Sequence, residues 1–367
     1  MVDEYKSISG RANLRLNRRE LLLILGNRED KVTTPLRSVG YDFSLIKVDK
    51  MGLIKLALMF RLLYVLLRER PLVLSDYPGG LSFAVLLLCK LLRLPFVLRL
   101  RGDIWLEFKQ ISLFNRIIRS FIADFLLQHS SKILPVSLSL VRIIESRKQV
   151  ASNKVRVIGI SRECGTKVIV SSEAVTHIQV IKEKHRYVLL TITNFNFLGK
   201  VKGLLELVPI LEELINKKNL DICWVIIGGG KYKNQFLQNI SQFHNVAIHV
   251  DMMGHVHNAS ALMQYADLVV YFSREDAAPN VVLESMCAGK VTVVNDYPPL
   301  MDIISDGETG IIVEPACVSS ATDAIADALL DTEKASAIGV NARKWAVENF
   351  DNQRIGKKFV EALNEAI

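Results

Sequence analysis

Cysteine is scarce in this sequence, and the spacing of the few cysteines indicates neither a disulfide framework nor a zinc site. The chain of 367 residues contains five of them, which are odd in number, far apart and never part of a C-x-x-C pair: Cys89, Cys164, Cys223, Cys287 and Cys317. Disulfide scaffolds and zinc sites usually show paired or closely spaced cysteines. We therefore expect reduced and mostly buried thiols, as in a cytoplasmic protein.

Long uncharged runs are also missing. No stretch reaches 18 residues without a charge, and the first 20 residues are charged with no apolar segment behind them. The sequence therefore predicts neither a transmembrane helix nor a secretory signal. The basic residues are not interleaved with aromatic residues and no nucleic-acid-binding motif occurs, so we expect no nucleic-acid partner.

Acidic charge is sparse in the first half of the chain. Residues 1–186 hold 32 lysines and arginines against 16 acidic residues, whereas residues 187–367 hold 14 against 22. A basic half favours an anionic partner. The Leu-rich, Arg-containing segments 53–70 and 81–96 are typical either of helices that lie in a membrane interface or of helices that cover a sheet. Peripheral contact with an anionic membrane is therefore one hypothesis.

Strand-like and helix-like segments alternate almost throughout. Each half offers six apolar, strand-like runs, which end at residue 161 in the first half and begin at residue 186 in the second. Continuous apolar strands that alternate with helices predict parallel sheets covered on both faces. We expect an α/β protein with Rossmann-like domains at 1–180 and 181–345, the seam lying within 171–187, and a C-terminal helix at 346–367 that returns to the first domain.

The segment 266–290 combines a strand, an acidic loop and a short helix. Pro279 marks the start of the helix and Gly289 its end. The amides of its first turn, at Asn280, Val281 and Val282, have no intrahelical partner and carry the positive end of the dipole, which favours a phosphate. Two acids flank this turn, Asp276 on the loop and Glu284 within the helix. They are either ligand-binding groups or ordinary helix-capping acids.

Two further loops follow predicted strands, and ligands of open α/β sheets bind at such loops. Gly228, Gly229 and Gly230 come directly after one strand, so the backbone there can approach a phosphate or base closely. Lys200 and Lys202 come after another and could meet a diphosphate. His255 and His257 lack further ligands nearby, so no metal site is expected.

The order of these pieces closely resembles glycosyltransferase family 4. The matching series comprises Lys202-Gly203, the glycine loop, the stretch ending at Gly254, the strand–acidic loop–helix segment and "DGETGIIVEP" (306–315). The resemblance implies the GT-B fold, in which two Rossmann-like domains face each other across a cleft and C-terminal helices pack back. It also implies a retaining transferase that uses a nucleotide sugar.

The resemblance assigns expected roles to individual residues. Asp276 stands at the first acid of the family's E-x7-E pattern, one methylene shorter, and would engage the donor sugar, although Glu275 could compete for this role. Glu284 matches the second acid and would hold the ribose. Lys202 matches one basic residue that binds the diphosphate, and Lys200 is a substitute for the other.

Other donor-binding residues would be Gly229, Gly230, Asn280, Val281 and Val282. In the first domain, Arg101-Gly102 stands where the family often has His-Gly, so a catalytic histidine is not carried over. Arg101 and Asp103 are instead expected on the acceptor side or against a phosphate.

We therefore expect a cytoplasmic, membrane-associated enzyme of polysaccharide biosynthesis. It would move a hexose from a UDP- or GDP-linked sugar to a glycan or lipid-linked acceptor. Neither a metal nor another cofactor is expected, because lysine and a helix dipole can neutralise the diphosphate. The alternatives are a nucleotide-sugar epimerase of similar fold, an inactive nucleotide-sugar-binding module and, less consistent with a phosphate site, a glycoside hydrolase.

Overall fold

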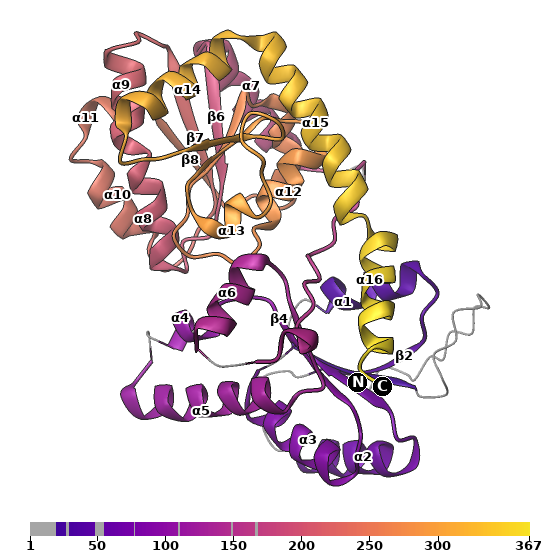
Figure 1. Ribbon diagram of the computed structural model, residues 1–367. Coiled ribbons are helices and arrows are strands. Elements are labelled where there is room, and N and C mark those ends of the chain that lie inside the picture. Colours follow the sequence, from indigo (N-terminus) through magenta and orange to yellow (C-terminus); the bar gives the residue numbers. More distant parts are fainter. Residues whose placement is uncertain are drawn as a thin grey trace. The chain divides into compact units, whose positions relative to one another are not determined.

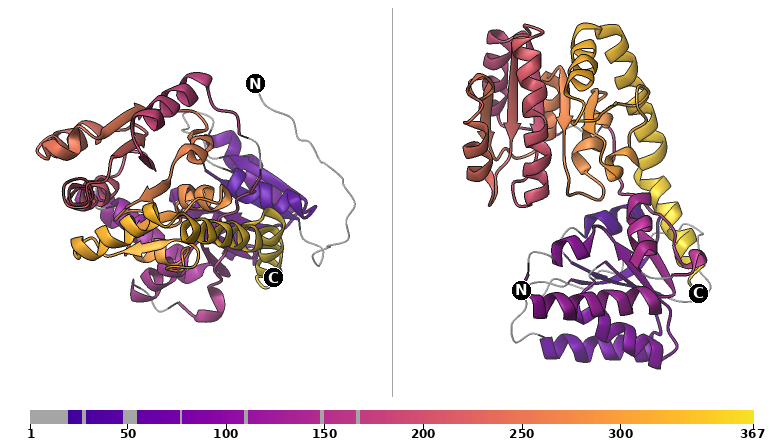
Figure 2. Two further views of the ribbon diagram at one scale, coloured as in Figure 1. Left: turned by 90° about the horizontal axis from the view of Figure 1, so that it is seen from above. Right: turned by 60° about the vertical axis from the view of Figure 1, so that its left-hand side comes forward.

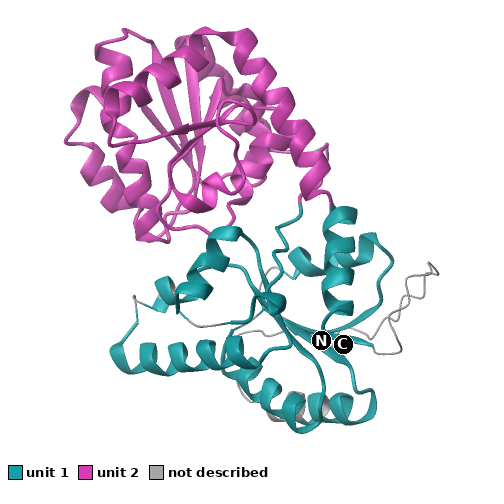
Figure 3. Cartoon of the chain, viewed as in Figure 1, with its two compact units in different colours: residues 1–161, 352–367 teal, residues 162–351 magenta. Residues whose placement is uncertain are grey.

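The computed structural model describes residues 20–26, 29–47, 55–76, 78–108, 111–147, 150–165 and 168–367. The chain forms two compact units (Figures 1 and 3). Unit 1 comprises residues 1–161 and 352–367, and unit 2 comprises residues 162–351. Each unit is an α/β fold built on one parallel sheet.

The sheet of unit 1 has the strand order β2-β1-β3-β4-β5, and all its pairs are parallel. Its strands are short and rich in Leu, Ile and Val, and β3, β4 and β5 are buried along their whole length. Such strands form because both faces are covered by helices. The strands are β1 (Leu21–Leu25), β2 (Phe43–Lys47), β3 (Leu72–Ser75), β4 (Phe96–Leu100) and β5 (Lys132–Pro135).

The C-terminal helix completes one face of this sheet. Ile355, Phe359 and Leu363 of α16 pack in one core cluster with α1 and with alternate strand residues. The helices of unit 1 are α1 (Asp30–Ser38), α2 (Lys55–Arg68), α3 (Gly80–Leu91), α4 (Ile104–Phe108), α5 (Leu113–His129), α6 (Leu138–Arg147), the 3-10 turn η1 (Ser152–Lys154) and α16 (Asn352–Asn364). The predicted return of the C-terminal helix therefore has a counterpart in α16, which begins later than residue 346.

The prediction of a sixth strand in the first half of the chain is wrong. Residues 154–161 run beside β5, where Arg156 N donates to Ile133 O at 3.0 Å and Ile158 N donates to Pro135 O at 2.9 Å. Only one isolated bridge, between Ile133 and Val155, is formed. The segment is apolar because Ile158 fills the core of unit 1, not because it is a strand.

The sheet of unit 2 has six parallel strands in the order β11-β10-β9-β6-β7-β8. Its strands are β6 (Tyr187–Ile192), β7 (Ile222–Ile227), β8 (Val250–Gly254), β9 (Leu268–Tyr271), β10 (Thr292–Asn295) and β11 (Ile311–Val313). The prediction of a strand over residues 245–250 is also wrong in its bounds. Its first part forms the short helix α11 (His244–Ala247), and β8 starts only at Val250.

Alternate residues of β6 enter two different cores. Leu189 packs with the side chains of α8, α9, α10 and α14, whereas Val188 and Leu190 pack with α7 and the 3-10 helix η2 on the other face. Figure 2 shows the two helical layers with the sheet between them. The remaining bounds are α7 (Ser172–Lys184), α8 (Leu198–Glu206), α9 (Val208–Asn216), α10 (Lys233–Ile240), η2 (Ala259–Tyr265), α12 (Asn280–Cys287), α13 (Pro298–Met301), α14 (Val318–Leu330) and α15 (Thr332–Phe350).

The division between the units falls at 161/162 rather than at 180/181. The uneven, charged stretch 171–187 is helix α7, whose Ala174, Ile178 and Ile181 lie in a core of unit 2. Its charge marks a solvent-exposed helix face and not a linker. None of the helices in the described ranges is long and apolar enough to span a membrane.

Candidate functional site

Two side chains meet at the point where the strand order of unit 2 reverses. From β6 the chain proceeds to β7 and β8 on one side of the sheet and then to β9 on the other, so the switch point lies between β6 and β9. Ligands of open α/β sheets bind at the carboxyl ends of the strands there. Lys200 follows β6, Asp276 follows β9, and Lys200 Nζ lies 3.0 Å from Asp276 Oδ2. The predicted lysine and acid are thus brought together.

Asp276 is held by three groups. Besides Lys200, the hydroxyl of Tyr271 donates to Oδ2 at 2.8 Å, and the amide of Ala277 donates to Oδ1 at 2.9 Å. Tyr271 ends strand β9 and is 2% exposed. Burial first, and the nearby Asp276 charge second, raise the pKa of the Tyr271 hydroxyl well above its usual range, so it stays protonated and donates.

The two candidate lysines have different environments. Lys200 is buried, and its ammonium also lies 5.8 Å from the ring of Tyr271 and 5.9 Å from the ring of Phe197. Lys202, which matches the family pattern, is exposed. Lys200, named from sequence only as a substitute, is therefore the lysine that contacts the acid.

Glu275 has a different partner from Asp276. Its Oε2 accepts the amide hydrogen of Gly199 at 2.9 Å, at the beginning of α8. That amide belongs to the first turn of a helix and lacks an intrahelical acceptor, so Glu275 satisfies it and complements the helix dipole. This contact separates the two neighbouring acids: Glu275 holds α8 in place, and Asp276 faces Lys200.

The glycine loop after β7 packs tightly against the loop after β6. Gly228 and Gly230 have φ angles of +145° and +143°, and a Cβ built on Gly228 would lie 1.7 Å from Thr193 O. Only glycine fits both positions. A Cβ on Gly229 would meet nothing within 4 Å, so this residue is the one in the loop with open space beside its Cα.

The helix that follows the acidic loop begins where the sequence predicted. Asn280 is its first residue and Pro279 its N-cap. The first-turn amides of Asn280, Val281 and Val282 are thus placed at the start of α12, as expected. Asn280 Oδ1 is buried and accepts no hydrogen bond within the described part of the chain. A buried acceptor without a donor is costly, and a ligand hydroxyl would relieve it.

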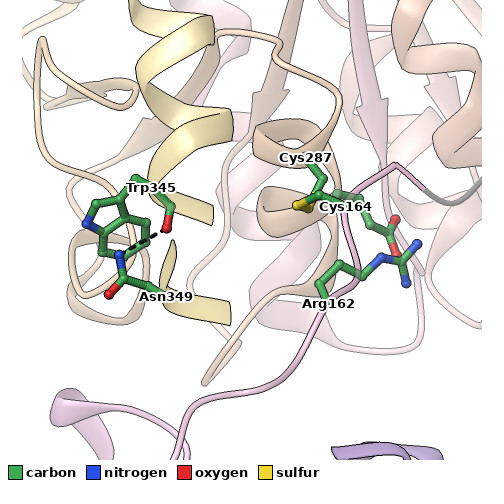
Figure 4. The surroundings of a disulfide bond; sticks show 6 residues. Arg162, Cys164, Cys287, Trp345 and Asn349 are labelled. Atoms are coloured by element: carbon green, nitrogen blue, oxygen red, sulfur yellow. Dashed lines mark hydrogen bonds and ion pairs between the residues drawn. A yellow bond between two sulfur atoms is a disulfide. The ribbon is translucent and has the colours of Figure 1, made fainter. Parts of the chain in front are cut away.

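Glu284 is paired with a residue that sequence reasoning missed. Arg162 Nη1 lies 3.0 Å from Glu284 Oε1, and the side chain of Glu284 is 16% exposed. Arg162 opens unit 2, more than a hundred residues earlier in the chain, so no local pattern links the two. Figure 4 shows Arg162 on the same segment as Cys164.

Cys164 and Cys287 form a disulfide, with their Cα atoms 4.8 Å apart (Figure 4). The expectation of reduced thiols is wrong for this pair. Their separation of 123 residues hid the contact, because only the folded sheet brings the start of unit 2 to the end of α12. Cys89 and Cys223 are buried free thiols, as expected, whereas Cys317 is free and exposed.

The candidate residues of unit 1 have partners of their own. Arg101 follows β4, and its guanidinium lies 3.3 Å from Asp76 Oδ2 at the end of the neighbouring strand β3. Burial raises the pKa of Asp76, and the charge of Arg101 offsets part of this. Asp103 Oδ1 accepts the amides of Trp105 and Leu106 at 3.0 Å each, so it caps α4. An acceptor role for Arg101 and Asp103 stays a prediction.

Helix α5, whose position Figure 1 shows, carries a large exposed apolar face. We call it the α5 face; it consists of Leu113, Phe114, Ile117, Ile118 and Phe121, each between 41% and 72% exposed. The residues of α5 that are buried come from its second half. The sequence shows the helical spacing of both sets, but periodicity cannot tell which set the sheet covers. The sequence therefore predicts 53–70 and 81–96 as candidate membrane-facing helices, but not the α5 face.

No group of three His, Cys, Asp or Glu side chains that could hold a metal ion occurs in the ranges that the structure describes. Near the switch point and the start of α12 the structure places the charged side chains of Lys200, Asp276 and Glu284.

Two parallel sheets, each covered by helices and followed by a C-terminal helix that joins the first unit, define the GT-B fold. The structure of Anabaena HepE in complex with UDP has this fold. It superimposes on this chain with a TM-score of 0.73, at 16% sequence identity, over 94% of this chain and 99% of HepE.

Residues 172–345 match the family model described as glycosyl transferases group 1. The chain is 22% identical over 323 residues to the capsular polysaccharide biosynthesis glycosyltransferase CapM of Staphylococcus aureus. This match covers 86% of this chain and 81% of CapM. It is 29% identical over 172 residues to a GDP-mannose-dependent phosphatidylinositol monomannoside mannosyltransferase of Mycolicibacterium smegmatis, a match that spans 44% of each chain. The resemblance to glycosyltransferase family 4 is thus confirmed, and the protein is a glycosyltransferase.

Proposed function

We propose that the enzyme is a retaining transferase that moves a sugar from a nucleoside-diphosphate sugar to a hydroxyl of a glycan or lipid-linked acceptor, without a metal ion. The observation that carries this proposal is the contact of Lys200 with Asp276 at the switch point of unit 2, 3.0 Å long, beside the start of α12. The capsular polysaccharide relative supports a glycan acceptor.

The chemistry requires charge stabilisation on both sides of the breaking bond. When the anomeric carbon leaves the diphosphate, negative charge grows on the phosphate oxygen and positive charge on the sugar ring. In this proposal the ammonium of Lys200 and the first-turn amides of α12 neutralise the phosphate, which makes a metal unnecessary. The Asp276 carboxylate faces the sugar, and Glu284, oriented by Arg162, binds the ribose hydroxyls.

The donor is tested with UDP-glucose, UDP-N-acetylglucosamine and GDP-mannose as probes. HepE has been crystallised with UDP-glucose, and the mycobacterial relative depends on GDP-mannose. We expect one probe to raise the melting temperature and to be hydrolysed slowly to free nucleotide. At a concentration of 100 times Kd, binding adds about 2.7 kcal/mol to the free energy of unfolding.

The same assay separates the alternatives. A transferase releases free nucleotide at an EDTA-insensitive rate, and NMR recorded before the released sugar mutarotates shows that its anomeric configuration is kept. An epimerase changes the sugar and leaves it attached to the nucleotide. Stabilisation without turnover of any kind would leave only a binding module, and a rate abolished by EDTA would contradict metal independence.

We further propose that the α5 face binds an anionic membrane, where a lipid-linked acceptor would be presented. Burial of its five exposed apolar side chains in the headgroup boundary lowers the free energy of the membrane-bound state. Arg119 is exposed on the same helix and Arg116 is partly exposed, so positive charge accompanies the apolar face. Basic residues near such a surface attract anionic lipid, with about 1 kcal/mol for each one.

Flotation with vesicles tests this surface. We expect the protein to float with vesicles of phosphatidylglycerol and phosphatidylcholine, and much less with phosphatidylcholine alone. Changing Phe114 and Ile117 to Asp should lower the bound fraction at least about tenfold, because two charges replace two apolar groups that would be buried.

The matched control carries the same two aspartates at Leu330 and Val340, which are exposed apolar residues of unit 2, 59% and 65% exposed. This variant should float like the wild type. Equal flotation of both variants, or of the wild type with neutral and anionic vesicles, would rule out the α5 face as an anionic-membrane surface.

A further inference from the structure

The strand that precedes the acidic loop ends in a tyrosine whose hydroxyl lies inside the site. Tyr271 is the last residue of β9, and its Oη donates to Asp276 Oδ2 at 2.8 Å. The residue is 2% exposed, so its ring is fixed by the core of unit 2 and the hydroxyl has little freedom to move. A strand-anchored donor of this kind holds a loop carboxylate in one orientation.

From this geometry we propose that Tyr271 is a positioning residue for sugar transfer, which fixes the orientation of the Asp276 carboxylate toward the donor sugar. The inference rests on the proposed role of Asp276, and it adds a residue to which neither the family pattern nor the sequence assigned a role. Tyr271 acts through Asp276 and needs no contact with the substrate itself.

The length of the acid explains why a tyrosine is needed. Asp276 is one methylene shorter than the glutamate expected at this place, so its carboxylate stays closer to the end of β9. There the Tyr271 hydroxyl reaches Oδ2 while Ala277 N donates to Oδ1 at 2.9 Å. The two donors hold the two oxygens of the carboxylate and so define its plane.

Lys200 makes the tyrosine more important once a donor is bound. Without ligand, Lys200 and Tyr271 share Oδ2. A diphosphate carries more negative charge than one carboxylate and attracts the ammonium of Lys200 more strongly. The hydroxyl stays protonated because burial raises the pKa of Tyr271 well above its usual range. It therefore remains a donor to Asp276 when the lysine turns toward the phosphate.

The test is a double-mutant cycle between Tyr271→Phe and Asp276→Asn, with the most rapidly hydrolysed of UDP-glucose, UDP-N-acetylglucosamine and GDP-mannose as the probe. Phe keeps the buried ring and removes only the hydroxyl. We expect Tyr271→Phe to lower kcat about tenfold, the scale of one hydrogen bond to a charged group, with KM for the donor within about twofold. In the Asp276→Asn background the same change should have no further effect on kcat.

Two more variants sharpen the result. Tyr265→Phe removes a tyrosine hydroxyl elsewhere in unit 2 and should leave kcat unchanged. In Asp276→Glu, the longer side chain carries the carboxylate past the hydroxyl, so adding Tyr271→Phe should cost less than twofold.

The outcomes separate this inference from the proposed function. If Asp276→Asn is inactive while Tyr271→Phe keeps full kcat, the positioning role is overturned and the role of Asp276 stands. Equal losses from Tyr271→Phe in the wild-type and Asp276→Asn backgrounds, together with a lower melting temperature, would mean a purely structural role. Full activity of Asp276→Asn would overturn both.

Discussion

Replacing Asp276 by Asn is expected to lower kcat for release of nucleotide from the donor by about 10²–10³-fold, the usual effect of removing one preorganised electrostatic group. Asn has nearly the same shape and can still accept from the Tyr271 hydroxyl, but it carries no charge toward the sugar. Binding of the donor, measured by thermal shift, should change much less, because the phosphate contacts proposed for Lys200 and α12 remain.

Two controls belong to this experiment. Asp323→Asn removes a carboxylate that pairs with Lys218 on the surface of the same unit, and it should keep full activity. Asp276→Asn also leaves the buried Lys200 without its anion, so its melting temperature must be measured alongside kcat. If Asp276→Asn stays within twofold of the wild type and Glu275→Gln is inactive, the role belongs to Glu275 instead.

The second large effect concerns stability. Breaking the Cys164–Cys287 disulfide should lower the free energy of unfolding of unit 2 by about 2–4 kcal/mol, since the bond closes a loop of 123 residues in the unfolded chain. For a unit of this size, each kcal/mol corresponds to about 2–4 °C in melting temperature. Cys164→Ser, Cys287→Ser and the double variant should all lose the same amount, as each removes the same bond.

Reductant and a third cysteine provide the controls. Dithiothreitol should lower the melting temperature of the wild type to that of the double variant and leave the double variant unchanged. Cys317→Ser, which removes the exposed free thiol of unit 2, should behave as the wild type does. A wild type that is insensitive to reductant would contradict the disulfide.

The site elements that lie close together in sequence were predictable. The strand, acidic loop and helix of 266–290 and the glycine loop follow from local apolar runs, a proline and three consecutive glycines, and the structure places them as β9, α12 and the loop after β7. Local patterns suffice because strand ends and helix starts are set by neighbouring residues.

What the sequence did not reveal depends on distant contacts. Arg162 reaches Glu284, and Cys164 reaches Cys287, only once the sheet is assembled. The choice between Lys200 and Lys202 was a matter of helix phase, because two residues along a helix change the direction of a side chain by about 200°. The motif pointed to Lys202, whereas packing buried Lys200.

The discontinuous composition of unit 1 has a consequence for how the chain folds during synthesis. Ile355, Phe359 and Leu363 of α16 fill the same core as β1 and α1, although the whole of unit 2 lies between these segments in the chain. Unit 1 therefore cannot close its core until α16 has been synthesised, whereas unit 2 is one continuous segment that is complete before α16. Domains usually fold in the order in which they emerge; in this molecule unit 2 can fold first, and the strands of unit 1 must wait for α16.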